Sequence, residues 1–142
     1  MKSYFITDLI LKDIDGVYAE LTSDFGYYSQ RLDCEIWVLK GFITDLESVP
    51  VLQSKSKRAG VIHDYLSRID AYPYVSKAMA AKIYLEAMTT RDRLYYNDAH
   101  WRKRLWLCIY RHFKSNFVKY VPDFVYWKKH KINATYEEMW NG

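Results

Sequence analysis

The order of its secondary-structure patterns is the feature that most constrains the fold of this chain. Up to Lys40, apolar and polar residues alternate in short runs separated by turn formers, which is typical of strands. Beyond residue 56, apolar residues recur at one-turn spacing, as they do on amphipathic helices. Strands followed by helices predict an α+β domain with a small N-terminal antiparallel β-sheet, a three-helix C-terminal half and an extended basic-aromatic tail.

Turn-forming residues organise the N-terminal half. Asp15-Gly16 is a strong hairpin signal between the first two apolar runs. We expect a second turn at residues 24–26, continued strand pairing at residues 27–30, and an ordered loop at residues 41–50, which holds a Gly, a Thr-Asp pair and a Pro. The runs with the strand pattern are Leu9–Leu11, Val17–Leu21 and Glu35–Leu39.

Capping residues mark the helices of the C-terminal half. Ser56 or a neighbour begins the first helix, which runs to about Ile69, and Ser76 begins the second. The third starts near Arg91 or Asp98 and ends at residue 113, and residues 136–140 form a short terminal helix. We therefore expect one α+β domain over residues 1–115 (strands about 7–40, motif loop 41–50, helices about 56–113) and a C-terminal arm over residues 116–142.

The two cysteines and the N-terminus bear on the cellular compartment. Cys34 and Cys108 lie far apart in apolar surroundings, which favours reduced core residues over a disulfide framework. No apolar run approaches the roughly 20 residues that span a bilayer, and the first residues do not form a signal peptide. We expect a protein that is made inside the cell and has no transmembrane segment.

Positive charge is concentrated in the C-terminal third. Between Trp101 and Lys131 a single acid, Asp123, faces many cations that alternate with aromatic rings. This pattern predicts an anionic partner: nucleic acid, a phospholipid surface or an acidic chain. The simpler alternative is a solvated helix face and an arm that docks on a neighbouring subunit. The candidate binding residues are Arg102, Lys103, Arg104, Arg111, Lys128, Lys129 and Lys131.

His63-Asp64 is the pair with the clearest chemical potential. Histidine changes protonation near neutral pH, so it is the natural general base. Adjacent helical residues point about 100° apart, so each needs its own partner, and the loop with Asp45 and Ser48 is the nearest source. In the alternative interpretation Asp45 makes a turn, Ser48 satisfies backbone donors and His63 bonds a carbonyl.

Two motifs together carry a family resemblance. Gly41-Phe-Ile-Thr-Asp-Leu-Glu-Ser-Val-Pro50 and Ala59-Gly-Val-Ile-His-Asp-Tyr-Leu-Ser-Arg68 resemble the loop and helix of the phage and bacterial family called domain of unknown function 1353. The resemblance covers roughly residues 7–112. It implies a phage or prophage origin, without an established activity. For a protein of that origin we expect synthesis in the host cytoplasm and association with the virion.

The His-Asp helix is also similar to that of secreted and parvoviral phospholipases of the A-two type. This resemblance implies His63 as the base, Asp64 (with Asp45) as a calcium ligand, and an orienting Asp at the position of Ala81, which this chain lacks. Asp45 is then the candidate to orient the imidazole, because losing the carboxylate that fixes a catalytic histidine costs about 10⁴ in rate. The supporting positions are Thr44, Ser48, Tyr65 and Ala81.

Two functions follow from these residues. The first is a bacteriophage virion, tail or assembly component that acts through contacts with other phage proteins or with its own copies, and in which the His-Asp site is a buried polar staple. The alternative is a calcium-assisted hydrolase of lipid esters with His63 as general base. The absence of an intact orienting Asp favours the structural interpretation.

Overall fold

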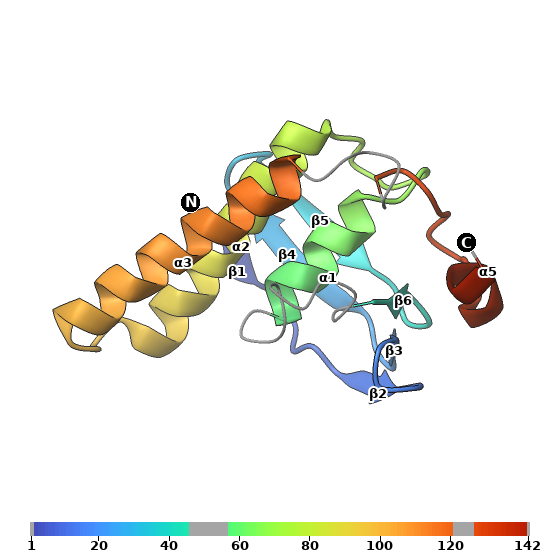
Figure 1. The fold of residues 1–142 in the computed structure, drawn as a ribbon, viewed down its shortest axis with the longest axis horizontal. Coiled ribbons are helices and arrows are strands. Elements are labelled where there is room, and N and C mark those ends of the chain that lie inside the picture. Colours follow the sequence, from blue (N-terminus) through green and yellow to red (C-terminus); the bar gives the residue numbers. More distant parts are fainter. Residues whose placement is uncertain (1, 46–56, 121–126, 142) are drawn as a thin grey trace.

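The computed structural model describes residues 2–45, 57–120 and 127–141, and it confirms the α+β class. Two three-stranded antiparallel sheets are followed by the helices (Figure 1). The strands are β1 (Tyr4–Phe5), β2 (Leu11–Asp13), β3 (Ala19–Leu21), β4 (Phe25–Ser29), β5 (Cys34–Val38) and β6 (Ile43–Thr44). The helices are α1 (Lys57–Leu66), α2 (Lys77–Tyr96), α3 (Trp101–Tyr120) and α5 (Tyr136–Asn141).

The first sheet has the order β1-β4-β5 and supplies one wall of the core. Tyr27 pairs with Ile36, and both side chains are buried. Phe25 and Gly26 belong to β4, so the turn expected at residues 24–26 is wrong. Gly26 is required because a Cβ there would lie 2.7 Å from the ring of Trp37 on the paired strand.

The second sheet has the order β2-β3-β6 and contains the predicted hairpin. Its turn is stabilised by Asp15, whose Oδ1 accepts hydrogen bonds from the backbone N–H groups of Val17 and Tyr18, and by Gly16 at φ 87°. β6 lies within the segment expected to be a loop, because Ile43 and Thr44 pair with β3 across a long stretch of sequence.

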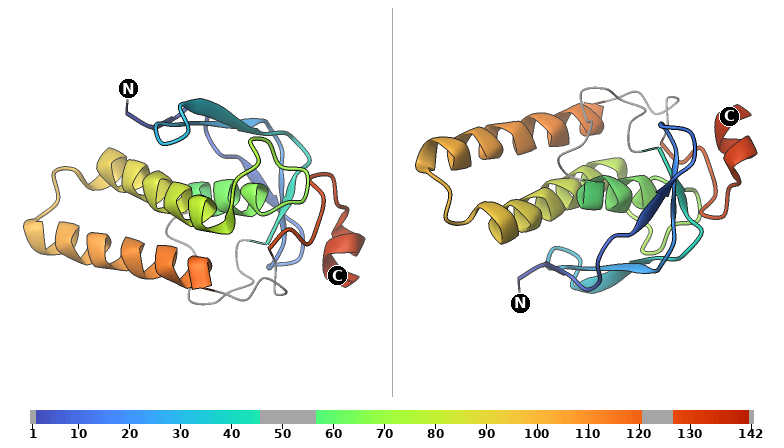
Figure 2. Two further views of the ribbon diagram at one scale, coloured as in Figure 1. Left: turned by 90° about the horizontal axis from the view of Figure 1, so that it is seen from above. Right: turned by 90° about the horizontal axis from the view of Figure 1, so that it is seen from below.

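The helices form two further layers on the first sheet (Figure 2). α1 and α2 pack against each other and contact that sheet, and α3 runs antiparallel along α2 on the side away from it. Ser76 caps α2 as predicted, with its side chain accepting from Met79 N. α3 begins at Trp101 and continues to Tyr120, beyond the expected end at residue 113.

The C-terminal residues return to the end of α1. Lys128 N donates to Ser67 O at 2.7 Å, and Ile69 N donates to His130 O at 2.8 Å. Val118 belongs to the main core, so the expected boundary at residue 115 falls inside α3. None of the helices in the described ranges combines the length and apolarity needed to span a bilayer.

Candidate functional site

α1 carries the His-Asp pair, and its two members face different surroundings. The His63 ring is only 6% exposed and lies 5.2 Å, centroid to centroid, from the Tyr84 ring of α2, at 58°. Asp64 points instead toward β6. This divergence follows from the 100° rotation per helical residue, and it is the reason why the pair does not act as one bidentate unit.

The Asp64 carboxylate is held by three groups from two parts of the chain. Its Oδ2 accepts a hydrogen bond of 2.7 Å from Thr44 Oγ1 and one of 3.3 Å from Asp45 N. Arg68, just beyond the end of α1, places Nη2 3.4 Å from both carboxylate oxygens. Residues 44–45 therefore do contact α1 as predicted. They bond to Asp64, whereas the prediction placed them beside His63.

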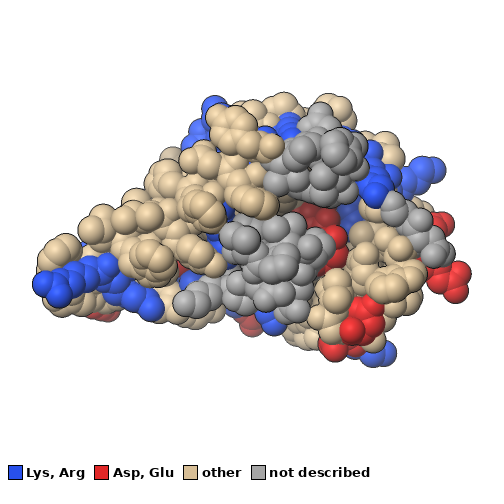
Figure 3. Space-filling model, viewed as in Figure 1, with Lys and Arg blue, Asp and Glu red and all other residues tan. Residues whose placement is uncertain are grey.

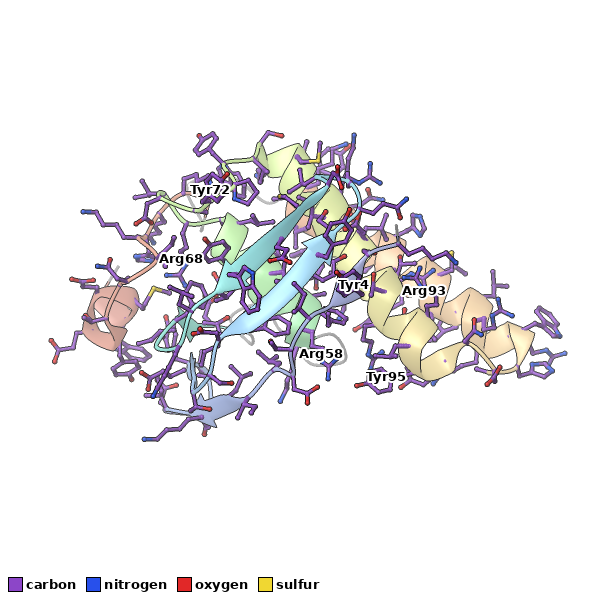
Figure 4. All side chains as sticks on the ribbon, turned by 180° about the vertical axis from the view of Figure 1, so that it is seen from behind. Tyr4, Arg58, Arg68, Tyr72, Arg93 and Tyr95 are labelled. Atoms are coloured by element: carbon purple, nitrogen blue, oxygen red, sulfur yellow. The ribbon has the colours of Figure 1, made fainter. Side chains whose placement is uncertain are left out.

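Arg68 is the residue that organises this cluster, and it is only 1% exposed. Its Nη2 donates to Ile43 O at 2.7 Å, and its Nη1 donates to Lys131 O and Met139 Sδ at 3.2 Å each. The guanidinium also lies 4.5 Å from the centre of the Phe42 ring. Figure 4 shows Arg68 at the C-terminal end of α1, between that helix and the arm that leads to α5.

Sequence reasoning did not single out Arg68. The available signal was the spacing of Asp64 and Arg68, because oppositely charged residues four apart on a helix lie side by side. That signal is common on solvated helices, and almost complete burial of an arginine is rare. The importance of Arg68 comes from its contacts with residues 42–43, 131 and 139, which are distant in sequence.

Burial controls the protonation of His63. It lowers the imidazole pKa to about 4, an effect that the Asp64 charge opposes and Lys77 reinforces. The imidazole is therefore neutral at physiological pH. A neutral imidazole can accept a proton, but a pKa this low makes it a weak base near pH 7.

The remaining predicted positions have structural surroundings. Tyr65 OH donates to Tyr72 O at 3.1 Å and accepts from Tyr72 N at 3.3 Å, which closes the loop after α1. Ala81 is buried, and its carbonyl accepts from Ser115 Oγ of α3 at 2.9 Å. Asp45 is half-buried, and Ser48 lies outside the described residues.

The surroundings of Asp64 do not suit a calcium ion. A hydroxyl, an N–H and a buried guanidinium already contact its carboxylate, and a nearby cation repels Ca²⁺. Within residues 2–45, 57–120 and 127–141, no group of three or more His, Cys, Asp or Glu side chains is placed to hold a metal.

The predicted cationic surface is divided between two ends of the molecule. Arg102, Lys103 and Arg104 lie at the tip of the α2–α3 hairpin, whereas residues 128–131 lie beside the C-terminal end of α1. Arg111 pairs with the buried Asp92 at 2.9 Å. Lys128 Nζ donates to Leu66 O and Arg68 O, both at 2.9 Å, so it caps α1.

One side of α3 is apolar and uncovered by any described residue. The side chains of Trp106, Ile109 and Phe113 are 57%, 54% and 54% exposed. We call this surface the α3 face, and its members are Leu105, Trp106, Ile109, Phe113 and Tyr120. The opposite side of the helix packs on α2, so the α3 face points away from the core.

The comparisons with known proteins show a family. Residues 19–108, well over half of the chain, match the family described as "Protein of unknown function (DUF1353)". No match was found among curated proteins or among solved structures. The likeness of α1 to a phospholipase helix stays a prediction. With the matched segment running from β3 through the Asp64–Arg68 cluster and into α3, the chain belongs to the DUF1353 family of proteins of unknown function.

Proposed function

We propose that this protein is an assembly component of a bacteriophage particle and acts through protein–protein contacts made by the α3 face. The observation that carries the proposal is the row of exposed apolar side chains along α3. A contiguous apolar surface of this kind on a folded domain is typical of an interaction site. The phage origin rests on the motifs at residues 41–50 and 59–68 and their resemblance to the phage and bacterial family.

The spacing on α3 supports contact with another protein. Trp106, Ile109, Phe113, Asn116 and Tyr120 follow one another at intervals of three and four residues. This is the spacing of a seam along which a helix packs against a partner. Tryptophan and tyrosine are also enriched among the residues that contribute most to protein–protein affinity.

The geometry around α1 supports a structural role for the His63-Asp64 motif. Asp64 joins β6 to α1, and Arg68 joins both to the C-terminal arm. These contacts fix a polar cluster that supports the domain. The proposal thus assigns the motif to stability and the α3 face to binding.

The test is incorporation into particles. The wild-type protein is expected in purified particles of the phage that encodes it, and the variant Trp106→Ser/Ile109→Ser/Phe113→Ser is expected to be absent from them. A matched control, Leu39→Ser/Ile69→Ser, removes exposed apolar side chains outside α3 and is expected to be incorporated normally. Circular dichroism checks that both variants fold. Equal incorporation of the α3 variant, or no wild-type protein in particles, contradicts the proposal.

The second candidate is a hydrolase of lipid esters that uses His63 as base. The observation in its favour is the neutral imidazole, which can accept a proton, and the observation against it is the pKa of about 4, which makes that imidazole a weak base at pH 7. The test is turnover of phospholipid vesicles, with and without calcium, by the wild type, His63→Ala and Ala81→Asp. The assembly proposal expects no turnover that depends on either residue. Loss of a measured activity in His63→Ala, with a gain in Ala81→Asp, supports the hydrolase instead.

A further inference from the structure

The N-terminal part of α3 combines exposed apolar rings with positive charge. Trp101, Leu105 and Trp106 are all more than half exposed, and Arg102 and Lys103 lie among them. Residues 101–120 contain six cations and no acid. Figure 3 shows Lys and Arg gathered at the tip of the hairpin, at the left of the view. We call this the basic tip, defined by Trp101, Arg102, Lys103, Leu105 and Trp106.

The opposite end of the molecule has the complementary character. Figure 1 places β2, β3 and α5 at the far end of the long axis from the hairpin tip, and Figure 3 shows Asp and Glu exposed there. Across residues 11–21 and 136–141, five acids are opposed by one cation, Lys12. We call this the acidic end, and its members are Asp13, Asp15, Glu20, Glu137, Glu138 and the 64% exposed Trp140.

The side chains of the acidic end are held in place by contacts with one another. The Tyr18 ring contacts the rings of Tyr136 and Trp140 edge-on, at 5.7 and 6.4 Å between centroids. Tyr136 OH donates to Asp15 Oδ2 at 2.7 Å, which fixes α5 on the β2–β3 turn. Thr135 and Glu138 form a reciprocal capping box at the start of α5. Aromatic rings and carboxylates are therefore held in one arrangement.

The distribution of charge favours one surface of a second copy over another as the partner of the basic tip. A symmetric contact of α3 with α3 places cations against cations, which is unfavourable at short range. A contact of the basic tip with the acidic end pairs opposite charges and buries aromatic rings from both sides. A contact of standard size takes about 800 Å² from each copy, roughly a tenth of the 8181 Å² surface.

We propose that the occupant of the basic tip is the acidic end of a second copy, so that the chains associate head to tail. The inference rests on the proposed assembly function and names its partner. The two surfaces of such a contact are different, so a pair of copies still has one free basic tip and one free acidic end that can bind further copies. The contact therefore generates rings or open filaments.

A charge exchange tests the pairing. The tip variant is Arg102→Glu/Lys103→Glu, and acids in the first turn of a helix are favourable for folding. The end variant is Glu20→Lys/Glu137→Lys, which leaves the turn residue Asp15 and the capping residue Glu138 intact. Sedimentation velocity at low salt and increasing protein concentration measures association of each protein and of their equimolar mixture.

The wild type is expected to associate, more weakly at high salt, and each variant alone is expected to show a dissociation constant raised at least about tenfold. The mixture is expected to recover association, because an acidic tip then meets a basic end and a basic tip meets an acidic end. A matched control, Lys40→Glu, changes an exposed charge outside both surfaces and is expected to behave as the wild type.

Three results overturn the head-to-tail contact: a wild type that stays monomeric, variants that associate as the wild type does, or a mixture without recovery. Association that is lost in the α3 face variant but unaffected by Glu20→Lys/Glu137→Lys indicates a symmetric α3 contact instead. The proposed function fails separately. A monomeric protein that still enters particles through the α3 face keeps the assembly role and loses only the self-association.

Discussion

Arg68, two residues beyond the end of α1, forms an ion pair with Asp64 of that helix, with Nη2 of the guanidinium 3.4 Å from both oxygens of the largely buried carboxylate. Burying such a pair costs desolvation energy, which further hydrogen bonds have to offset. Thr44 and the backbone at residues 43, 45 and 131 supply those bonds. The pair thus holds together segments that come from very different parts of the chain.

Removing the guanidinium is expected to be strongly destabilising. Arg68→Met leaves the Asp64 carboxylate without its cation and frees the carbonyls of Ile43 and Lys131. We expect a loss of about 3–5 kcal/mol in the free energy of unfolding, measured by urea denaturation. Arg102→Met, on the exposed tip, is the control and is expected to change stability by less than about 0.5 kcal/mol.

The double variant Asp64→Leu/Arg68→Met measures how strongly the two charges are coupled. Because both charges are removed together, we expect it to be more stable than Arg68→Met alone. If the double variant loses as much free energy of unfolding as Asp64→Leu and Arg68→Met lose in sum, the two charges are not coupled.

The hydroxyl of Thr44 is expected to contribute through Asp64. Thr44→Val keeps the shape of the buried side chain but removes the donor of the 2.7 Å hydrogen bond. We expect a loss of about 1–3 kcal/mol, since a charged acceptor loses a partner. Thr44→Ser retains the hydroxyl and is expected to lose less than Thr44→Val. The reverse order would show that the methyl group matters more than the bond.

His63 is expected to make stability depend on pH. Burial lowers its pKa to about 4 from 6.5, so the unfolded chain binds a proton that the folded chain rejects. This contribution is fully present above about pH 6.5 and is lost as the pH falls toward 4, up to about 3 kcal/mol in total. The measurement is the free energy of unfolding across this pH range.

Two variants isolate this histidine from other titrating groups. In His63→Gln the slope between pH 6.5 and 4 is expected to become shallower than in the wild type. His112→Gln, at an exposed position on α3, is expected to retain the wild-type slope. An unchanged slope in His63→Gln would refute the link between burial and protonation.

The ammonium of Lys128 is expected to stabilise the end of α1. It donates to Leu66 O, the last carbonyl of α1, and to Arg68 O, two residues beyond the helix. Lys128→Met keeps the apolar stem and the backbone conformation, and we expect a loss of about 1–3 kcal/mol by urea denaturation. Lys129→Met is the neighbouring exposed control. Equal effects of the two substitutions would contradict the capping role.

Local signals in the sequence were sufficient for much of the fold. Asp15-Gly16 predicts the hairpin because its turn chemistry is contained in a few residues, and Ser76 predicts the start of α2 for the same reason. β1 was not expected, because Tyr4 and Phe5 become a strand only by pairing with Tyr28 and Tyr27. β6 was likewise hidden in an expected loop, since its partner is β3.

The candidate site was predicted in part. The meeting of Thr44 and Asp45 with α1 was expected, and it occurs at Asp64. The direction of the His63 ring depends on how α2 packs, and a single sequence does not specify that packing. Arg68 was missed because charged side chains are usually exposed, and only tertiary contacts reveal its burial.

The bonds of Arg68 to Lys131 and Met139 connect the segment that matches the family with residues that lie beyond it. Both acceptors lie beyond residue 108, where the family match ends, whereas Arg68 itself lies inside it. The matched segment therefore relies on residues outside it to satisfy the hydrogen-bond donors of its buried guanidinium. Shortening the protein to the matched segment would remove those acceptors, so the segment is expected to be less stable alone than within the whole chain.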